Sequence, residues 1–299
     1  MITIKNIFFT LCCLSLFSCE DFFSTTLELD PPISEDLLAV HAFGNTRTNT
    51  LEVLVSKTLS VDQIANTNSF VNDATVKLFL GNDLIFDLQP PIANERYNFF
   101  MPEGVHVFLE GQEYRLEVVA DEYPLASATC IIPNDVNPIN VIFEEEAGSD
   151  FDGYEYSGIN VKINDPIDTE NHYETSALWG YPDGSGDLRF DHRYTESNDA
   201  SLEYGISNLI ATDLSFEGEE KTFELRISRI NIEFEPDELE KLYVNWRTTT
   251  KDHYLFNKTV TALKDNEGDP FSSPVQVYSN IENGIGLFSI VTEQFIKVD

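Results

Sequence analysis

The chain has 299 residues, with 52 Asp and Glu against 18 Lys and Arg, so its formal charge is −34 at pH 7. This acidity excludes sequence-independent binding to nucleic acid, which needs dense Lys and Arg, and it disfavours adsorption on an anionic membrane surface. Hydrophobic residues make up 42% of the chain and aromatic residues 12%, which is ample for a folded core and excludes a disordered chain.

Residues 1–18 have the composition of a secretory signal peptide. Lys5 supplies a positive charge, a short apolar run follows, and Ser18 is a small residue in front of Cys19. The apolar run is shorter than the about 20 residues that a membrane-spanning helix needs. With Leu16 three positions before Cys19, the segment resembles a bacterial lipobox. This resemblance implies that Cys19 is lipidated and becomes the new N-terminus.

Residues 19–36 are rich in acidic residues and proline and predict an extended tether. Glu20 and Asp21, directly after the lipidated position, resemble the surface-export tag of Bacteroidota lipoproteins. We therefore expect an outer-membrane lipoprotein that faces the cell exterior, with the periplasm-facing orientation as the alternative. Cys130 is then the one cysteine left without a role, and its apolar segment predicts a buried, inert thiol in a strand.

Residues 37–133 contain short alternating or apolar segments bounded by turn residues, which is typical of strands. The expected strands cover residues 37–43, 51–57, 75–80, 84–88, 97–101, 113–120 and 125–132. Their number and spacing predict an N-terminal antiparallel β-sandwich of immunoglobulin or transthyretin type. Residues 58–74 break the pattern, and we expect them to form a loop that is a candidate contact edge.

Pro133 and Pro138 mark a predicted domain boundary, and residues 139–299 form a second predicted β-rich domain. The expected strands there cover residues 139–144, 157–164, 172–179, 187–193, 203–206, 221–234, 240–248, 275–278 and 287–298. The acidic run over residues 144–152 is interpreted as a hydrated linker. Apolar residues at helical spacing predict one helix over about 250–264, with Thr250 as its N-cap. The sequence thus predicts an all-β fold of two antiparallel β-sandwich-like domains with one helix near the C-terminus.

The tail carries the stretch SNIENGIGLF, which includes Asn280, Gly284, Gly286 and Phe288. With the lipobox, an Asp-Pro step at residue 165 and the helix before the tail, it resembles an uncharacterised Bacteroidota outer-membrane lipoprotein family, a domain of unknown function. That resemblance implies an accessory of TonB-dependent transporters and carries no catalytic residues. The two glycines allow a tight turn or bulge before the final strand, so we expect a structural role for this motif.

Motifs for catalysis are missing from the sequence: it has no GxSxG, SxxK or HExxH motif and no phosphate-binding glycine loop. Single histidines on strands are interpreted as satisfied polar residues. Their positions are His41, His106, His172, His192 and His253. We therefore expect a protein that is not an enzyme.

Two groups of residues are candidates for binding. Asp183, Ser185 and Asp187 place oxygen atoms at alternating positions on a glycine-rich loop, which suits a Ca²⁺ ion. A polar hairpin turn explains the same residues and is the favoured interpretation. No other cofactor is expected. Aromatic residues near this loop form a predicted binding rim, with rings in the core or at a turn as the alternative. The rim residues are Trp179, Tyr181, Tyr173 and Tyr194.

These observations predict a lipid-anchored, non-catalytic accessory subunit that docks on an outer-membrane β-barrel protein, most simply a TonB-dependent transporter. Residues 58–74 and 179–192 are the expected contact edges. A subunit of outer-membrane protein assembly or secretion machinery is one alternative. A surface lipoprotein that binds glycans alone is the other.

Overall fold

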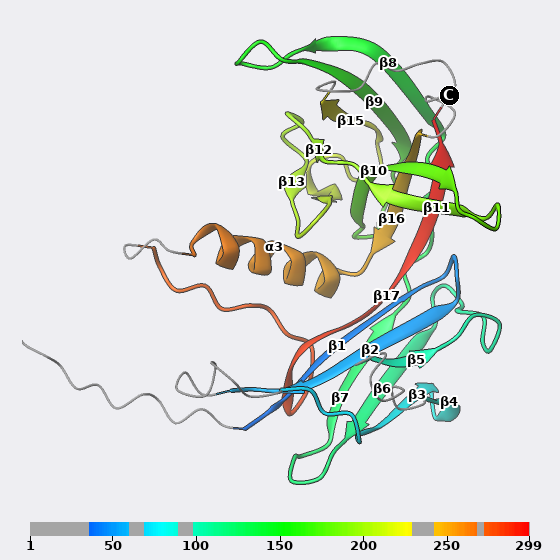
Figure 1. Cartoon of the computed structure of the whole chain (residues 1–299), viewed down its shortest axis with the longest axis vertical. Helices are drawn as coiled ribbons and strands as arrows, with labels where there is room; N and C mark the ends of the chain where they lie inside the picture. Colours follow the sequence, from blue (N-terminus) through cyan, green and yellow to red (C-terminus); the bar gives the residue numbers. More distant parts are fainter. Residues whose placement is uncertain (1–35, 60–68, 89–97, 229–241, 268–271, 299) are drawn as a thin grey trace, which may run out of the picture.

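The computed structural model describes residues 36–59, 69–88, 98–228, 242–267 and 272–298. Figure 1 shows a lower half built from the N-terminal strands and an upper half built from later strands, with one helix projecting between them. The strands of the lower half are β1 (Leu38–Asn45), β2 (Thr50–Lys57), β3 (Thr75–Leu80), β4 (Asp83–Leu88), β5 (Asn98–Met101), β6 (Glu113–Val119) and β7 (Ala126–Ile131).

The later part of the chain is also mostly strand. Its elements are β8 (Asn140–Ser149), β9 (Glu155–Asn164), β10 (His172–Pro182), β11 (Leu188–His192), β12 (Thr195–Glu196), β13 (Glu203–Tyr204), β14 (Leu209–Thr212), the 3₁₀ turn η2 (Asp213–Ser215), β15 (Glu220–Ser228), β16 (Leu242–Thr249), α3 (Lys251–Asp265) and β17 (Gly284–Lys297). The predicted all-β fold with a helix near the C-terminus is confirmed.

One sheet runs through both halves of the molecule. Its strand order is β13-β14-β10-β16-β17-β1-β2-β5, with β11 also paired to β10. Two four-stranded sheets, β4-β3-β6-β7 and β12-β15-β9-β8, complete the architecture. The long strand β17 joins the halves: residues 284–291 pair in parallel with β1, and residues 292–297 pair antiparallel with β16. This parallel pair is a departure from the expected purely antiparallel sheets.

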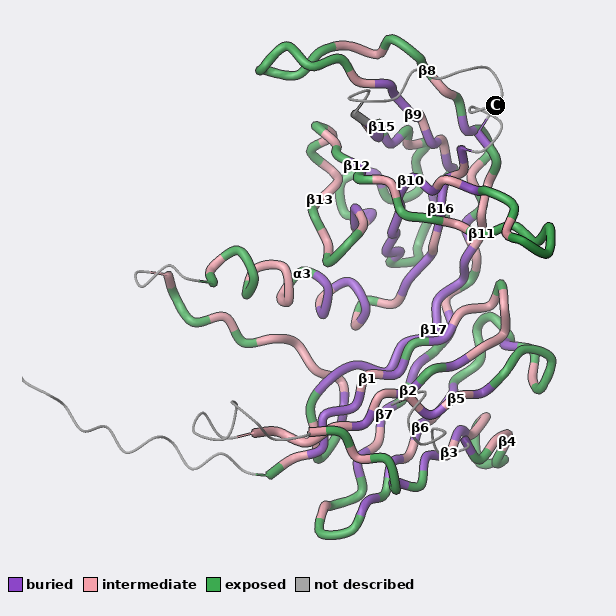
Figure 2. Tube along the Cα trace, in the orientation of Figure 1, coloured by how far each residue is buried: buried purple, intermediate pink, exposed green. Residues whose placement is uncertain are grey.

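Alternation of apolar residues along the strands buries two hydrophobic clusters, one in each half (Figure 2). The first cluster lies between β1 and β2 on one side and β3, β6 and β7 on the other, and it includes Cys130. The second cluster surrounds Trp246 in the upper half. The predicted division into residues 37–133 and 139–299 stays a prediction, but Phe288 and Ile290 of β17 belong to the first cluster. The C-terminal segment therefore completes the N-terminal core.

Helix α3 follows directly from β16. Its N-cap is Thr250, whose side chain accepts a hydrogen bond from the backbone N–H of His253, as the sequence predicts. The buried face of the first two turns contains His253, Tyr254, Phe256 and Asn257. The predicted inert thiol is also confirmed: Cys130 is buried, and burial raises its pKa to about 12.

Two sequence-based expectations about single segments are wrong, and two short strands are not predicted by the sequence. The acidic run is no linker: β8 continues to Ser149 and pairs with β9, with its acidic side chains on an edge strand, where charge opposes pairing with other chains. Residues 275–278 form no strand, because the Tyr278 backbone N–H donates to Thr259 of α3 rather than to a neighbouring strand. The short strands β12 and β14 were not anticipated. Most of the expected loop 58–74 lies outside the described residues, and Phe70 bridges to Ser56 of β2.

Candidate functional site

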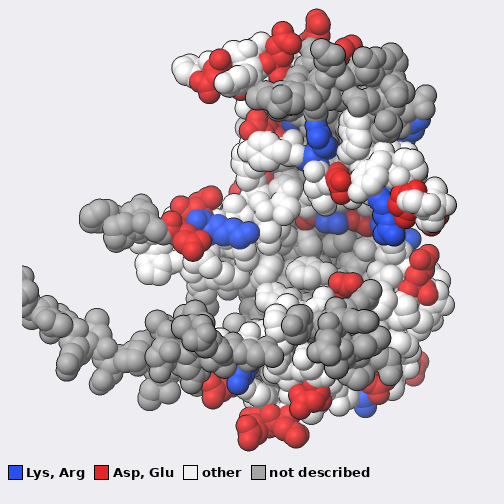
Figure 3. All heavy atoms as spheres, viewed as in Figure 1, with Lys and Arg blue, Asp and Glu red and all other residues white. Residues whose placement is uncertain are grey.

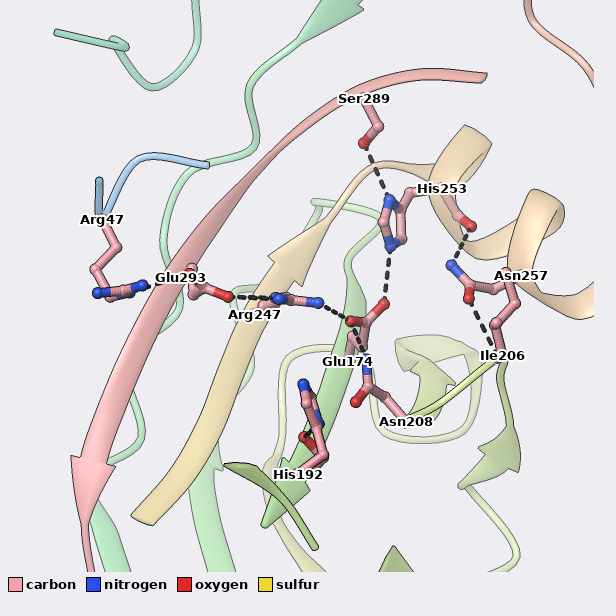
Figure 4. A network of polar contacts seen from close by, with 11 residues as sticks. Arg47, Glu174, His192, Ile206, Asn208, Arg247, His253, Asn257, Ser289 and Glu293 are labelled. Atoms are coloured by element: carbon pink, nitrogen blue, oxygen red, sulfur yellow. Dashed lines mark hydrogen bonds and ion pairs between the residues drawn. The ribbon is translucent and has the colours of Figure 1, made fainter. Parts of the chain in front are cut away.

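Three charged residues stand side by side across the middle of the large sheet. Glu174 on β10 lies opposite Arg247 on β16, and Arg247 lies opposite Glu293 on β17. Strand register therefore brings together side chains that are far apart in the sequence. Figure 4 shows the resulting row, in which the Arg247 guanidinium lies between the two carboxylates.

Both carboxylates are paired with basic groups. Arg247 Nε donates to Glu293 Oε1 at 2.8 Å, while Arg247 Nη1 donates to Glu174. Arg47, in the turn after β1, donates from Nε to Glu293 Oε2 at 3.0 Å. The side chains of Glu174 and Glu293 are each 3% exposed, whereas those of Arg247 and Arg47 are 23% and 38% exposed, so the carboxylates are the buried members of these pairs. Buried charges of this kind are stable only when they are paired, and here the two arginines balance the two glutamates.

Helix α3 adds an imidazole to the row. The N-cap at Thr250 fixes the first turn of the helix, and His253 of that turn reaches the sheet with Nε2 2.8 Å from Glu174 Oε2. On its other side, His253 Nδ1 lies 3.2 Å from Ser289 Oγ of β17. Because a carboxylate only accepts hydrogen bonds, Nε2 carries the proton that is donated to Glu174.

The electrostatics of the row favour ionised Glu174. Burial opposes its charge, but the neighbouring Arg247 and His253 outweigh this and lower the pKa of Glu174 to about 2. Burial likewise disfavours the charge of Arg247, and the two glutamates outweigh it and raise the pKa of the guanidinium. Glu174 and Arg247 are thus both charged at ordinary pH.

A cavity of about 320 Å³ opens beside this row. It is lined by Phe43, Gly44, Asn45, Glu174, Ile206, Ser207, Asn208, Arg247, His253, Asn257, Ser289 and Val291. Both halves of the chain contribute, since β1 supplies one wall and β10, β16, α3 and β17 supply the others. The surface in Figure 3 is hollowed between the upper and lower halves, with basic and acidic side chains in the hollow. The cavity lies in the size range of small-molecule sites, about 300–1,000 Å³.

Amides hold the walls of the cavity in place. Asn208 Nδ2 donates to Glu174 Oε1 at 2.6 Å. Asn257 Nδ2 donates to the backbone carbonyl of His253, and Asn257 Oδ1 accepts from the backbone N–H of Ile206. The loop before β14 is thereby fixed to the first turns of α3. The site is preformed rather than assembled by a ligand.

The predicted aromatic rim is only partly present. Tyr173 is buried in the second cluster, where its ring stacks on Trp246 at 5.3 Å, so its assignment to the rim is wrong. Trp179 is half-buried, with the Arg193 guanidinium 5.5 Å from its ring centre. Tyr181 and Tyr194 are exposed. The rim residues lie on and after the β10–β11 hairpin and line a different surface from the cavity.

The predicted Ca²⁺ residues form a hydrogen-bonded turn. Asp183 Oδ1 accepts from the backbone and side chain of Ser185 and from the backbone N–H of Asp187, and Asp183 Oδ2 accepts from Arg189 Nε at 2.9 Å. These contacts favour the alternative of a polar hairpin turn, and a Ca²⁺ ion here stays a prediction. Within the described residues, no three His, Cys, Asp or Glu side chains gather as they would around a metal ion.

The tail motif lies where β17 begins. Asn280 Oδ1 accepts from the Phe288 backbone N–H at 2.9 Å, and Asn280 Nδ2 donates to the Phe288 carbonyl at 2.9 Å. Gly286 has a φ of +120°, and a Cβ atom there would lie 2.0 Å from the Val40 carbonyl oxygen. A Cβ on Gly284 would lie 2.8 Å from the Leu38 oxygen. The glycines therefore let β17 approach β1.

The Asp-Pro step at residue 165 has a structural explanation as well. Asp165 is buried and accepts hydrogen bonds from the Tyr173 hydroxyl and from the Gly218 backbone N–H. Asp213 in turn accepts from the backbone N–H of Asn171. These two carboxylates fix the segment that leads into β10.

Sequence reasoning missed the charged row, although a signal was present. Glu174, Arg247 and Glu293 each sit inside a segment that otherwise reads as a buried strand. A charged residue at such a position is almost always paired. Which residues pair could be known only from the register of three distant strands.

A model of one protein family, described as "Domain of unknown function (DUF4249)", matches residues 24–295. The chain belongs to the DUF4249 family. Membership of an uncharacterised family, expected from the tail motif, is thereby confirmed. No curated protein matches this DUF4249 chain. Among the described residues of this DUF4249 member, the structure contains no helix with the length and apolar character of a membrane span.

Proposed function

We propose that the protein is a lipid-anchored binding subunit of the outer membrane. It faces the cell exterior and docks on an outer-membrane β-barrel protein of the TonB-dependent transporter type. The observation that carries the binding function is the preformed cavity, whose charged side chains are already paired with one another. Location is supported by the lipobox at Cys19 and by the resemblance of the tail to surface lipoproteins.

The tether fits this location. Residues 20–36 follow the lipidated Cys19 and span at most about 60 Å when fully extended. The folded part can therefore reach a barrel protein beside its anchor. Signals for export and anchoring precede the first described strand, β1.

The burial of Ser289 favours binding over catalysis in this cavity. Ser289, His253 and Glu174 lie in the order of a nucleophile, a base and an acid, and this order alone suggests hydrolysis. Ser289 lines the cavity but is only 1% exposed, so its hydroxyl offers little surface to a substrate carbonyl. The ionised state of Glu174 does not decide the matter, because the carboxylate of such a triad stays ionised, so the case against hydrolysis rests on the burial of Ser289.

The β10–β11 hairpin is the proposed docking edge. It projects from the upper half in Figure 1, and it exposes Tyr181 and Leu188, with Tyr194 just beyond β11. Exposed apolar residues on a rigid hairpin are suited to bury area against a partner. The second expected edge, residues 58–74, falls mostly outside the described residues.

Purification from native membranes in mild detergent tests the proposal. We expect a TonB-dependent transporter, identified by mass spectrometry, to co-purify with the protein, and Leu188→Glu to abolish this. Leu214→Glu is the matched control, because Leu214 is also an exposed leucine but lies on η2. Recovery of the protein alone, or equal recovery of the partner with both variants, would contradict docking at this edge. Co-purification of assembly or secretion components would favour that alternative instead.

Anchoring has its own test. The Cys19→Ala variant should leave the membrane fraction, and intact mass measurement of the wild type should show acyl chains on Cys19. If the Cys19→Ala variant stays in the membrane fraction, the proposed lipid anchor is wrong. Protease treatment of intact cells should remove the folded part only if it faces the exterior.

A further inference from the structure

We infer that the cavity beside the charged row binds a neutral, polyhydroxylated molecule of about the size of a monosaccharide. The inference names the ligand class of the binding function proposed above. The cavity holds about 320 Å³, equivalent to about ten water molecules. This is enough for one small ring with its substituents and too little for a folded partner segment.

Charge is the first argument. The row contains two arginines and two glutamates, and each carboxylate is already paired. An anionic ligand at Arg247 would lie beside Glu174 and Glu293, whereas a cationic ligand at Glu174 would lie beside Arg247. Either one has to displace a buried ion pair, which is costly, so a neutral ligand is favoured.

Unused hydrogen-bonding capacity is the second argument. A guanidinium has five N–H groups, and Arg247 uses three of them on the two glutamates, which leaves donors for a ligand. A carboxylate has about four acceptor positions, and Glu174 uses three, for Asn208, Arg247 and His253. Spare donors and a spare acceptor thus line the same cavity. A hydroxyl group can accept from Arg247 and donate to Glu174 at once, which neither a purely accepting nor a purely donating group can do.

The apolar wall is the third argument. Phe43 of β1 lines the cavity and is 42% exposed, and its ring lies 6.3 Å from that of His253 in an edge-on arrangement. Val291 of β17 adds aliphatic surface to the lining. A cavity that combines an aromatic and an aliphatic side chain with polar groups suits a ring that carries both C–H groups and hydroxyls.

Calorimetric titration of the purified, lipidated protein tests the inference, in a detergent without a sugar headgroup. The neutral probes are glucose, N-acetylglucosamine and myo-inositol. Glucuronate and glucosamine carry one negative and one positive charge on the same ring, and glycine serves as a small zwitterion. We expect saturable binding of at least one neutral probe, at least about tenfold tighter than its charged counterparts. Preference for glucuronate, glucosamine or glycine, or no binding of any neutral probe at millimolar concentration, would overturn the inference.

Two variants place the ligand in the cavity. Phe43→Ala should weaken binding of the neutral probe about tenfold, because it removes the aromatic wall. Phe151→Ala is the control and should leave the affinity unchanged, since Phe151 is fully exposed at the β8–β9 turn. Equal affinities of the two variants would refute this location. Docking on a barrel is measured separately by co-purification, so either idea can fail while the other stands.

Discussion

Glu174 illustrates how burial and pairing compete at a single residue. Its side chain is almost inaccessible to solvent, yet it is ionised, because Arg247, His253 and Asn208 supply the hydrogen bonds that water would otherwise give. The same contacts position the wall of the cavity. Loss of this one carboxylate charge therefore affects both stability and the shape of the site.

The Glu174→Gln variant should reveal this as a pH dependence of stability. Because the folded-state pKa is lowered from 4.5 to about 2, ionisation of Glu174 stabilises the fold above pH 4.5, and this contribution disappears as the pH falls toward 2. We expect the free energy of unfolding of the wild type to exceed that of the variant by about 3 kcal/mol at pH 7. The difference should shrink between pH 4.5 and 3, as followed by denaturant unfolding at each pH. A difference independent of pH would contradict the assignment.

At the scale of elements, the most important one is β17, because the glycines at its start allow it to pair with β1. Gly286 has no room for a side chain next to the Val40 carbonyl, and its φ of +120° disfavours any other residue. The glycines of the tail motif therefore permit the close approach of the β17 and β1 backbones. The hydrogen bonds of Asn280 to Phe288 hold the preceding segment against β17.

Gly286→Ala should accordingly destabilise the fold by more than about 2 kcal/mol, through backbone strain and the clash with β1. The matched control is Gly184→Ala, because a Cβ atom on Gly184 meets nothing within 4 Å. That variant should stay within about 0.5 kcal/mol of wild type. Thermal or denaturant unfolding of the two variants gives the comparison, and similar stabilities would show that the close approach is unimportant.

Individual elements were largely predictable from local pattern. Apolar alternation located the strands of the lower half, and the Thr250 cap and helical spacing located α3. Failures arose where tertiary contacts decide: residues 275–278 have strand-like composition but run along α3, held by hydrogen bonds from Tyr278 to Thr259 and Asp252. Sequence reasoning names His253 as a satisfied polar residue but misses its partner Glu174, because only the register of β10, together with the cap of α3, brings the two side chains to 2.8 Å.

At the scale of the whole molecule, the two halves are linked through shared packing. Phe288 of β17 belongs to the first cluster, while Ile296 of the same strand packs against the second. The cavity lies at this junction and takes residues from both halves. Its geometry therefore depends on how firmly the halves are joined.

We expect the two halves to unfold as one cooperative unit. Phe288→Ala removes a buried ring from the first cluster and should cost about 3–5 kcal/mol. Phe223→Ala does the same in the second cluster, on β15. In native-state hydrogen exchange, each variant should lower the protection of the most stable amides in both halves by a similar amount. Loss of protection confined to the mutated half would show that the halves unfold independently.

The position of β17 also affects how the protein is made. All the other described strands leave the ribosome before β17 does. The parallel partner of β1 is therefore synthesised more than two hundred residues after β1 itself. Neither hydrophobic cluster is complete until that last strand arrives, so stable structure forms late during synthesis. A chain of this topology therefore stays open until β17 has emerged.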